Sequence, residues 1–72
     1  MTDATATILV NGQREPLRPG TLAALLQERG IDPEGRGIAV AVNGAVVPRA
    51  AWPHTRLAAG DTVEIVQAKQ GG

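Results

Sequence analysis

The sequence contains no cysteine and almost no aromatic residues. Trp52 is the single aromatic side chain among 72 residues, and seven basic side chains balance seven acidic ones. Without cysteine the chain has no disulfide, no thiolate metal ligand and no thiol nucleophile. Without a cationic surplus and stacking rings it lacks the two usual signs of nucleic-acid binding. These absences exclude several common classes of small protein and predict no nucleic-acid partner.

Long hydrophobic runs are absent as well. No apolar stretch approaches the roughly 20 residues that a membrane-spanning helix needs, and residues 1–7 lack the basic leader and apolar core of a signal peptide. We therefore expect no membrane partner and a cytoplasmic location. A chain of 72 residues forms one domain and buries only about 60% of the surface of its unfolded form, which leaves room for one modest core.

Two Asn-Gly pairs predict hairpin turns. Asn11-Gly12 and Asn43-Gly44 each separate two extended segments. A type I′ hairpin turn needs positive φ at both central residues, which asparagine and glycine tolerate best. Pro16 has no amide donor, so the strand that contains it is expected at a sheet edge. The predicted strands are residues 7–10, 13–17, 38–42, 45–47 and 62–68.

One amphipathic helix is predicted over residues 22–29. Thr21 is a suitable N-cap, the leucines at 22, 25 and 26 form one apolar stripe, and Gly30 suits the left-handed position that ends a helix. The stripe must pack on one face of the sheet, with the first and last strands paired near its centre. This order of elements predicts an α+β β-grasp (ubiquitin-like) fold, a mixed four- to five-stranded sheet with one helix on one face. Residues 49–60 are predicted to be irregular.

The chain closes on Lys69, Gln70, Gly71 and Gly72. Because none of them buries an apolar side chain, we expect a flexible tail on a domain that spans 1–68, with 1–6 frayed. Two closing glycines occur by chance in about one chain in two hundred, so a passive terminus stays open. An α-carboxylate, with a reference pKa of about 3.3 to 3.7, is ionised at neutral pH. It could attack the α-phosphate of ATP inside a partner enzyme. Glycines have no Cβ, so they could pass through a narrow channel that leads to such a site.

Other candidate residues are fewer. If the sheet alternates as expected, Leu9 and Val66 point away from the helix as neighbouring apolar residues and form a partner-facing patch near the tail. Arg49 is either a contact to a partner carboxylate or an ordinary exposed arginine. His54 is expected to be a solvated loop residue, and Trp52 an anchor for the irregular segment.

The sequence resembles the ThiS family of bacterial sulfur carriers over residues 8–72. The motifs that carry the resemblance are Val42-Asn43-Gly44, Val47-Pro48-Arg49, Trp52, Gly60-Asp61 and the final Gly71-Gly72. The resemblance implies that a ThiF-like enzyme adenylates Gly72 with ATP and magnesium, and that a donor such as a cysteine desulfurase supplies sulfur for a thiocarboxylate. Thiazole synthase (ThiG) would then use this sulfur for the thiazole of thiamine. The chain itself would be a protein co-substrate with no bound cofactor, and Lys69 and Gln70 would contact the partners beside the glycines.

Three alternatives remain open. The small subunit of molybdopterin synthase (MoaD-like) uses the same terminal chemistry, and the combination of Val47-Pro48-Arg49 with Trp52 favours ThiS over it. A ubiquitin-like modifier would be joined to target lysines. A passive β-grasp interaction module would keep its activity without Gly72.

Overall fold

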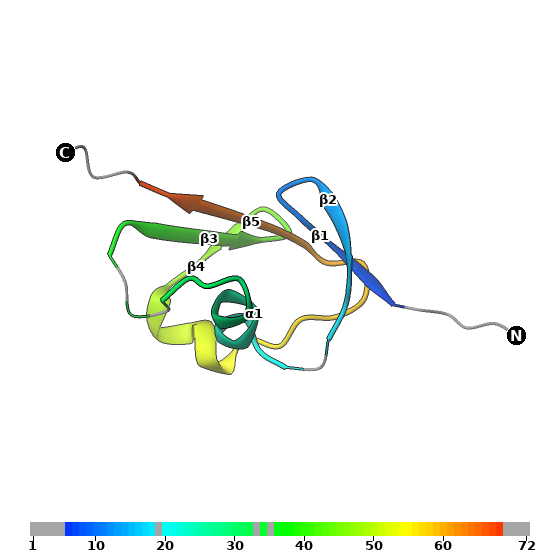
Figure 1. The fold of residues 1–72 in the computed structure, drawn as a ribbon, viewed down its shortest axis with the longest axis horizontal. Coiled ribbons are helices and arrows are strands. Elements are labelled where there is room, and N and C mark those ends of the chain that lie inside the picture. The colour runs from blue at the N-terminus through cyan, green and yellow to red at the C-terminus, as the bar shows by residue number, and fades with distance from the viewer. Residues whose placement is uncertain (1–5, 19, 33, 35, 69–72) are drawn as a thin grey trace, which may run out of the picture.

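A mixed five-stranded sheet forms the framework of the molecule. The computed structural model describes residues 6–18, 20–32, 34 and 36–68. The strands lie in the order β2 (Gln13–Pro16), β1 (Thr7–Val10), β5 (Thr62–Gln67), β3 (Ile38–Val42) and β4 (Ala45–Val47) (Figure 1). Only β1 and β5 pair in parallel, and the other pairs are antiparallel. The edge position of β2, which contains Pro16, is confirmed.

Both hairpins turn at the predicted Asn-Gly pairs. Asn11 and Gly12 have φ of 51° and 83°, and Asn43 and Gly44 have φ of 52° and 84°. Positive φ at both central residues is the requirement of the type I′ turn, whose twist matches that of the flanking strands. The two turns therefore have nearly the same φ angles.

Helix α1 (Leu22–Glu28) packs its leucines against the sheet. The Thr21 hydroxyl accepts a hydrogen bond from the Ala24 amide at 3.3 Å and caps the helix N-terminus. Leu22 and Leu26 are completely buried. The helix ends one residue earlier than predicted because Arg29 is its C-cap, and Gly30 follows with φ of 78°.

A second helix corrects the sequence prediction. Residues 49–54 form a 3₁₀ helix, η1 (Arg49–His54), so the prediction of irregular chain over 49–60 is wrong for this part. The tight turns allow Trp52 to enter the core, where it is only 1% exposed, while its indole Nε1–H donates to the Val47 carbonyl at 2.8 Å. Sequence periodicity gave no signal for η1 because runs this short have none. The expected anchoring role of Trp52 is confirmed.

The core lies between the sheet and the two helices, which share one side of it (Figure 1). The sheet supplies alternate residues of its strands, and α1 and η1 supply the rest: Ile8, Val10, Leu22, Leu26, Val40, Trp52, Val63 and Ile65. This arrangement is the predicted β-grasp fold. Ala6, assigned above to a frayed segment, accepts a hydrogen bond from the Leu17 amide at 2.9 Å. Residues 1–5 and the predicted tail 69–72 lie outside the described residues.

Candidate functional site

The C-terminal half of β5 extends beyond its neighbour β1. The parallel register pairs Leu9 with Thr62 and Val10 with Val63, after which β1 ends and β5 continues to Gln67. The start of β1 and the end of β5 consequently lie at opposite ends of the molecule (Figure 1). The chain approaches the candidate carboxylate of Gly72 through this projecting part of β5.

Strand β3 and the residue before it hold this projecting part along one side. Pairing with β3 runs from Val63 to Gln67, and the Ala68 amide then donates to the Gly37 carbonyl at 2.7 Å. Gly37 has φ of 76°, and a Cβ there would lie 3.4 Å from both the Cβ and the carbonyl oxygen of Ala68. A glycine at this position therefore provides the positive φ and the close approach that the contact with Ala68 needs.

The sheet face that points away from α1, here called the outer face, carries exposed apolar residues near this point. Val66 on β5 is 62% exposed and lies opposite Ala39, and Val46 on β4 is 77% exposed and lies opposite Ala41. The small alanines lie between the two valines, and the exposed Glu64 borders them because it lies opposite Ala41 on the same face. We call the two valines and the two alanines the outer patch. Exposed apolar residues beside the strand that leads toward Gly72 make this part of the outer face a candidate docking surface.

The predicted pairing of Leu9 with Val66 needs correction. Both face outward, and Leu9 is half-buried. The register places Leu9 opposite Thr62, however, which is four residues before Val66 and about 13 Å away along the strand. The two residues share a face but are not neighbours, so the outer patch near the end of β5 is formed by Val66 and Val46 instead. A sequence cannot reveal this offset of a parallel register. Val46 was missed for another reason, because its place depends on β4 lying beside β3 in the sheet.

Arg49 is not brought to the outer patch. It begins η1, on the helix side of the sheet, where its Nη1 donates to the Glu34 carbonyl at 3.2 Å. Of the remaining predicted site residues, Lys69, Gln70, Gly71 and Gly72 lie outside the described part of the chain.

The acidic and imidazole groups show no arrangement suited to catalysis. Asp61 is occupied in its turn, since its carboxylate accepts from the Ala58 amide at 2.8 Å and from Asn43 Nδ2 at 3.0 Å. Glu64 and His54 are exposed and lie on opposite sides of the sheet. Within residues 6–18, 20–32, 34 and 36–68, no three His, Cys, Asp or Glu side chains come together as a potential metal site. In the same ranges no helix has the length and hydropathy to cross a membrane.

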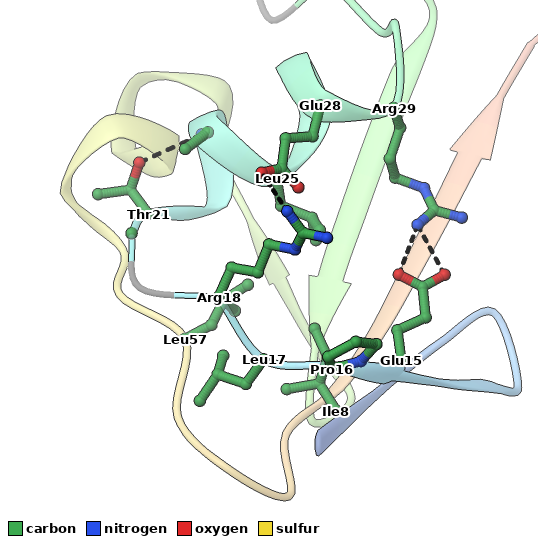
Figure 2. A pocket seen from close by; sticks show the side chains of 12 residues that line it. Ile8, Glu15, Pro16, Leu17, Arg18, Thr21, Leu25, Glu28, Arg29 and Leu57 are labelled. Atoms are coloured by element: carbon green, nitrogen blue, oxygen red, sulfur yellow. Dashed lines mark hydrogen bonds and ion pairs between the residues drawn. The ribbon is translucent and has the colours of Figure 1, made fainter. Parts of the chain in front are cut away.

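A pocket of about 210 Å³ lies on the helix side, between α1 and β2 (Figure 2). Its apolar wall includes Ile8, Leu17, Leu25 and Leu57. The charged groups at its rim pair with one another: Arg29 donates to both carboxylate oxygens of Glu15 at 2.8 Å, and Arg18 lies 3.7 Å from Glu28 (Figure 2). Of these two pairs only Arg29–Glu15 has hydrogen-bond distances, and Arg18–Glu28 is a looser and more exposed ion pair.

Comparison with known proteins decides the family. A family model described as the ThiS family matches residues 7–72. The chain belongs to the ThiS family. Among its ThiS relatives, the sulfur carrier protein ThiS of Thermus thermophilus is 37% identical over 65 residues, which cover 90% of this chain and 98% of that protein.

A solved structure of the ThiS family confirms the fold. The crystal structure of thiamine biosynthesis protein ThiS from Geobacter metallireducens matches with a TM-score of 0.74 and 26% sequence identity. The match covers 92% of this chain and 99% of that one. The β-grasp fold and the ThiS resemblance inferred from the sequence are therefore both confirmed, and the family match includes the closing Gly71-Gly72.

Proposed function

We propose that the chain is a sulfur carrier that bears its sulfur on the C-terminal carboxyl group of Gly72 and donates it for formation of the thiazole moiety of thiamine. The single observation that carries this proposal is the ThiS family match, which spans residues 7–72 and so includes every described strand and helix. The names of the two relatives point to the same role.

The proposed chemistry needs only a main-chain carboxylate from this protein. A carboxylate oxygen of Gly72 attacks the α-phosphate of ATP, the bond to the bridging oxygen breaks, and pyrophosphate leaves. The terminal persulfide sulfur of a donor such as a cysteine desulfurase then attacks the carbonyl carbon of the acyl-adenylate, and AMP leaves with one former carboxylate oxygen. A thiol reductant cleaves the S–S bond of the resulting acyl disulfide, which releases the thiocarboxylate and leaves the donor cysteine in a disulfide with the reductant. ATP and magnesium belong to a ThiF-like activating enzyme in this scheme. Because activation consumes ATP, we place the cycle in the cytoplasm.

The described structure supports a division between a docking domain and a reactive end. The outer patch lies on the strand that leads toward Gly72, so a partner that binds the patch is well placed to receive the following residues. Val66 is the patch residue nearest to that end. We extend this docking role to Lys69 and Gln70, and we assign Leu9 and Arg49 at most to the periphery because the outer patch does not include them.

Deletion of Gly72 tests the proposal directly. All eight core residues lie between Ile8 and Ile65, so the shortened chain should keep its melting temperature. Both chains are incubated with ATP, magnesium, the cognate activating enzyme and a sulfur donor, and their intact masses are measured. We expect the full chain to exchange one oxygen for sulfur at its last residue, and the shortened chain to remain unmodified.

Two results would contradict the proposal. One is an unmodified full chain with an activating enzyme that is active on its own carrier. The other is a shortened chain that still supports thiazole formation by a ThiG-type synthase, which would favour a passive module. Sulfur transfer to molybdopterin synthase but not to thiazole synthase would instead favour the MoaD-like alternative.

A further inference from the structure

Backbone hydrogen bonds join β1 to β5 and to the residues just before β5, until β1 turns away. The Leu9 amide donates to the Asp61 carbonyl at 3.0 Å, and the Asn11 amide donates to the Val63 carbonyl at 2.9 Å. A parallel ladder would next use the backbone two residues further on. The chain reverses at Asn11-Gly12 instead, so β1 offers no peptide group to the rest of β5.

The side chain of Asn11 forms the next hydrogen bonds to β5 in place of the β1 backbone. Its Oδ1 accepts a hydrogen bond from the Ile65 amide at 2.7 Å, and its Nδ2 donates to the Ile65 carbonyl at 3.2 Å. A carboxamide carries the same donor and acceptor as a peptide group. Asn11 therefore extends the ladder by one step with its side chain, after the backbone of β1 has left the sheet.

Beyond Ile65, the described chain holds β5 only from the β3 side. Antiparallel pairs alternate between bonded and non-bonded. Since Ala68 bonds to Gly37, the intervening pair of Gln67 with Ile38 is a non-bonded one, and the Gln67 peptide groups face the side that β1 has left. The last described residues before the candidate reactive end are consequently held by the β3 pairing as far as Gly37 on one side, and by Asn11 at Ile65 on the other.

We propose that Asn11 is a positioning residue for the carrier: its carboxamide fixes β5 at Ile65, so that Ala68, the last described residue before the candidate reactive end, is presented to the activating enzyme in one orientation. This inference rests on the proposed function of the Gly72 carboxylate. A segment whose starting direction is fixed before binding loses less conformational freedom on entering a partner's site, which improves binding. The carboxamide itself never touches the reacting atoms.

The second Asn-Gly turn provides a matched control. Asn43 lies in the same type of turn and has nearly the same φ as Asn11. Its carboxamide also hydrogen-bonds to β5, since it accepts from the Thr62 amide at 3.0 Å, and it donates to Asp61 Oδ1 at 3.0 Å. Its contact lies three residues before that of Asn11, about 10 Å further from the reactive end. The two side chains thus make comparable clamps at the two ends of one strand.

The test compares Asn11→Gly with Asn43→Gly. Glycine retains the positive φ of each turn and removes only the carboxamide. By amide hydrogen exchange we expect Asn11→Gly to speed exchange at Ile65, Val66 and Ala68 by roughly tenfold or more relative to Asn43→Gly. In adenylation assays the concentration of carrier at half-maximal rate should rise roughly three- to tenfold for Asn11→Gly only, about the effect of one hydrogen bond. The maximal rate should stay the same.

Equal exchange at these three amides in both variants, or equal half-saturation concentrations, would overturn the proposal. If Asn11→Gly does not fold, Asn11→Asp replaces it, since the carboxylate still accepts from the Ile65 amide but no longer donates; its half-saturation concentration should exceed that of the wild type. Should the wild-type chain itself not be adenylated, the proposed function fails, and hydrogen exchange alone decides whether Asn11 fixes the end of β5.

Discussion

The inner and outer faces of the sheet are built from alternate residues of the same strands, yet neighbouring residues on the two faces differ sharply in burial. Ile65 is 8% exposed and belongs to the core, whereas its neighbour Val66 is 62% exposed and belongs to the outer patch. Both are β-branched apolar residues on the central strand. Their difference separates two uses of hydrophobicity on this sheet: cohesion on the inner face, and on the outer face the recognition that we propose.

Substitution of each neighbour by alanine gives the largest expected contrast. Ile65→Ala should lower the free energy of unfolding by about 2–5 kcal/mol, the usual loss for a buried isoleucine, because it leaves a cavity in the core. Domain stabilities are only about 5–15 kcal/mol in total, so this loss is severe. Val66→Ala should change stability by less than about 0.5 kcal/mol. Urea denaturation followed by circular dichroism measures both, and similar losses would show that the outer face is also structural.

Substitution of Val66 by glutamate tests the recognition role of the outer face. A charge on the outer patch should remain solvated in the free protein and leave the unfolding midpoint nearly unchanged. In the complex the charge loses water against an apolar partner surface, so the dissociation constant for the activating enzyme should rise about tenfold. Titration calorimetry measures it. The control is Thr7→Glu, because Thr7 lies on β1 and also faces outward, but at the opposite end of the sheet from Val66. Equal binding by wild type and Val66→Glu would remove the outer patch from the interface.

Particular residues show how far the sequence alone could predict this molecule. The β-grasp fold, both Asn-Gly turns and the Thr21 cap followed from local chemistry, because turn type, capping and alternation depend on nearby residues. The 3₁₀ helix η1 did not, since six residues show no distinct periodicity. The offset between β1 and β5 could not be predicted from local chemistry either, because a parallel register depends on distant parts of the chain.

The candidate site was predicted less completely than the fold for the same reason. Val66 followed from strand alternation, but its neighbour Val46 and the clamp at Asn11 depend on which strands lie together and in which register. Asn11 was recognised only as a turn residue, since its second role requires Ile65, 54 positions later, to be placed beside it. Long-range register is therefore the information that local patterns lack.

Substitutions in the charged rim of the pocket should have the smallest effect on stability. Their effect can be compared with the stability that the apolar inner face contributes. Arg29 and Glu15 join the end of α1 to the edge strand β2 at 2.8 Å with side chains 33% and 29% exposed, whereas Arg18 and Glu28 are 3.7 Å apart and 68% and 52% exposed. Exposed pairs contribute only about 0.2–1 kcal/mol, and charge-assisted hydrogen bonds raise the value. A double-mutant cycle with Arg29→Ala and Glu15→Gln should give a coupling near the top of this range.

The cycle with Arg18→Ala and Glu28→Gln should give a coupling close to zero, because that pair is more exposed and less well aligned. Both cycles are measured by urea denaturation, and the coupling of Arg29 with Glu15 should decrease in 1 M salt, where the Debye length falls to about 3 Å. Equal couplings for the two pairs would mean that geometry at the rim is irrelevant to stability. A coupling as large as the loss from Ile65→Ala would mean that the attachment of α1 to β2 depends on charge as much as on the apolar core.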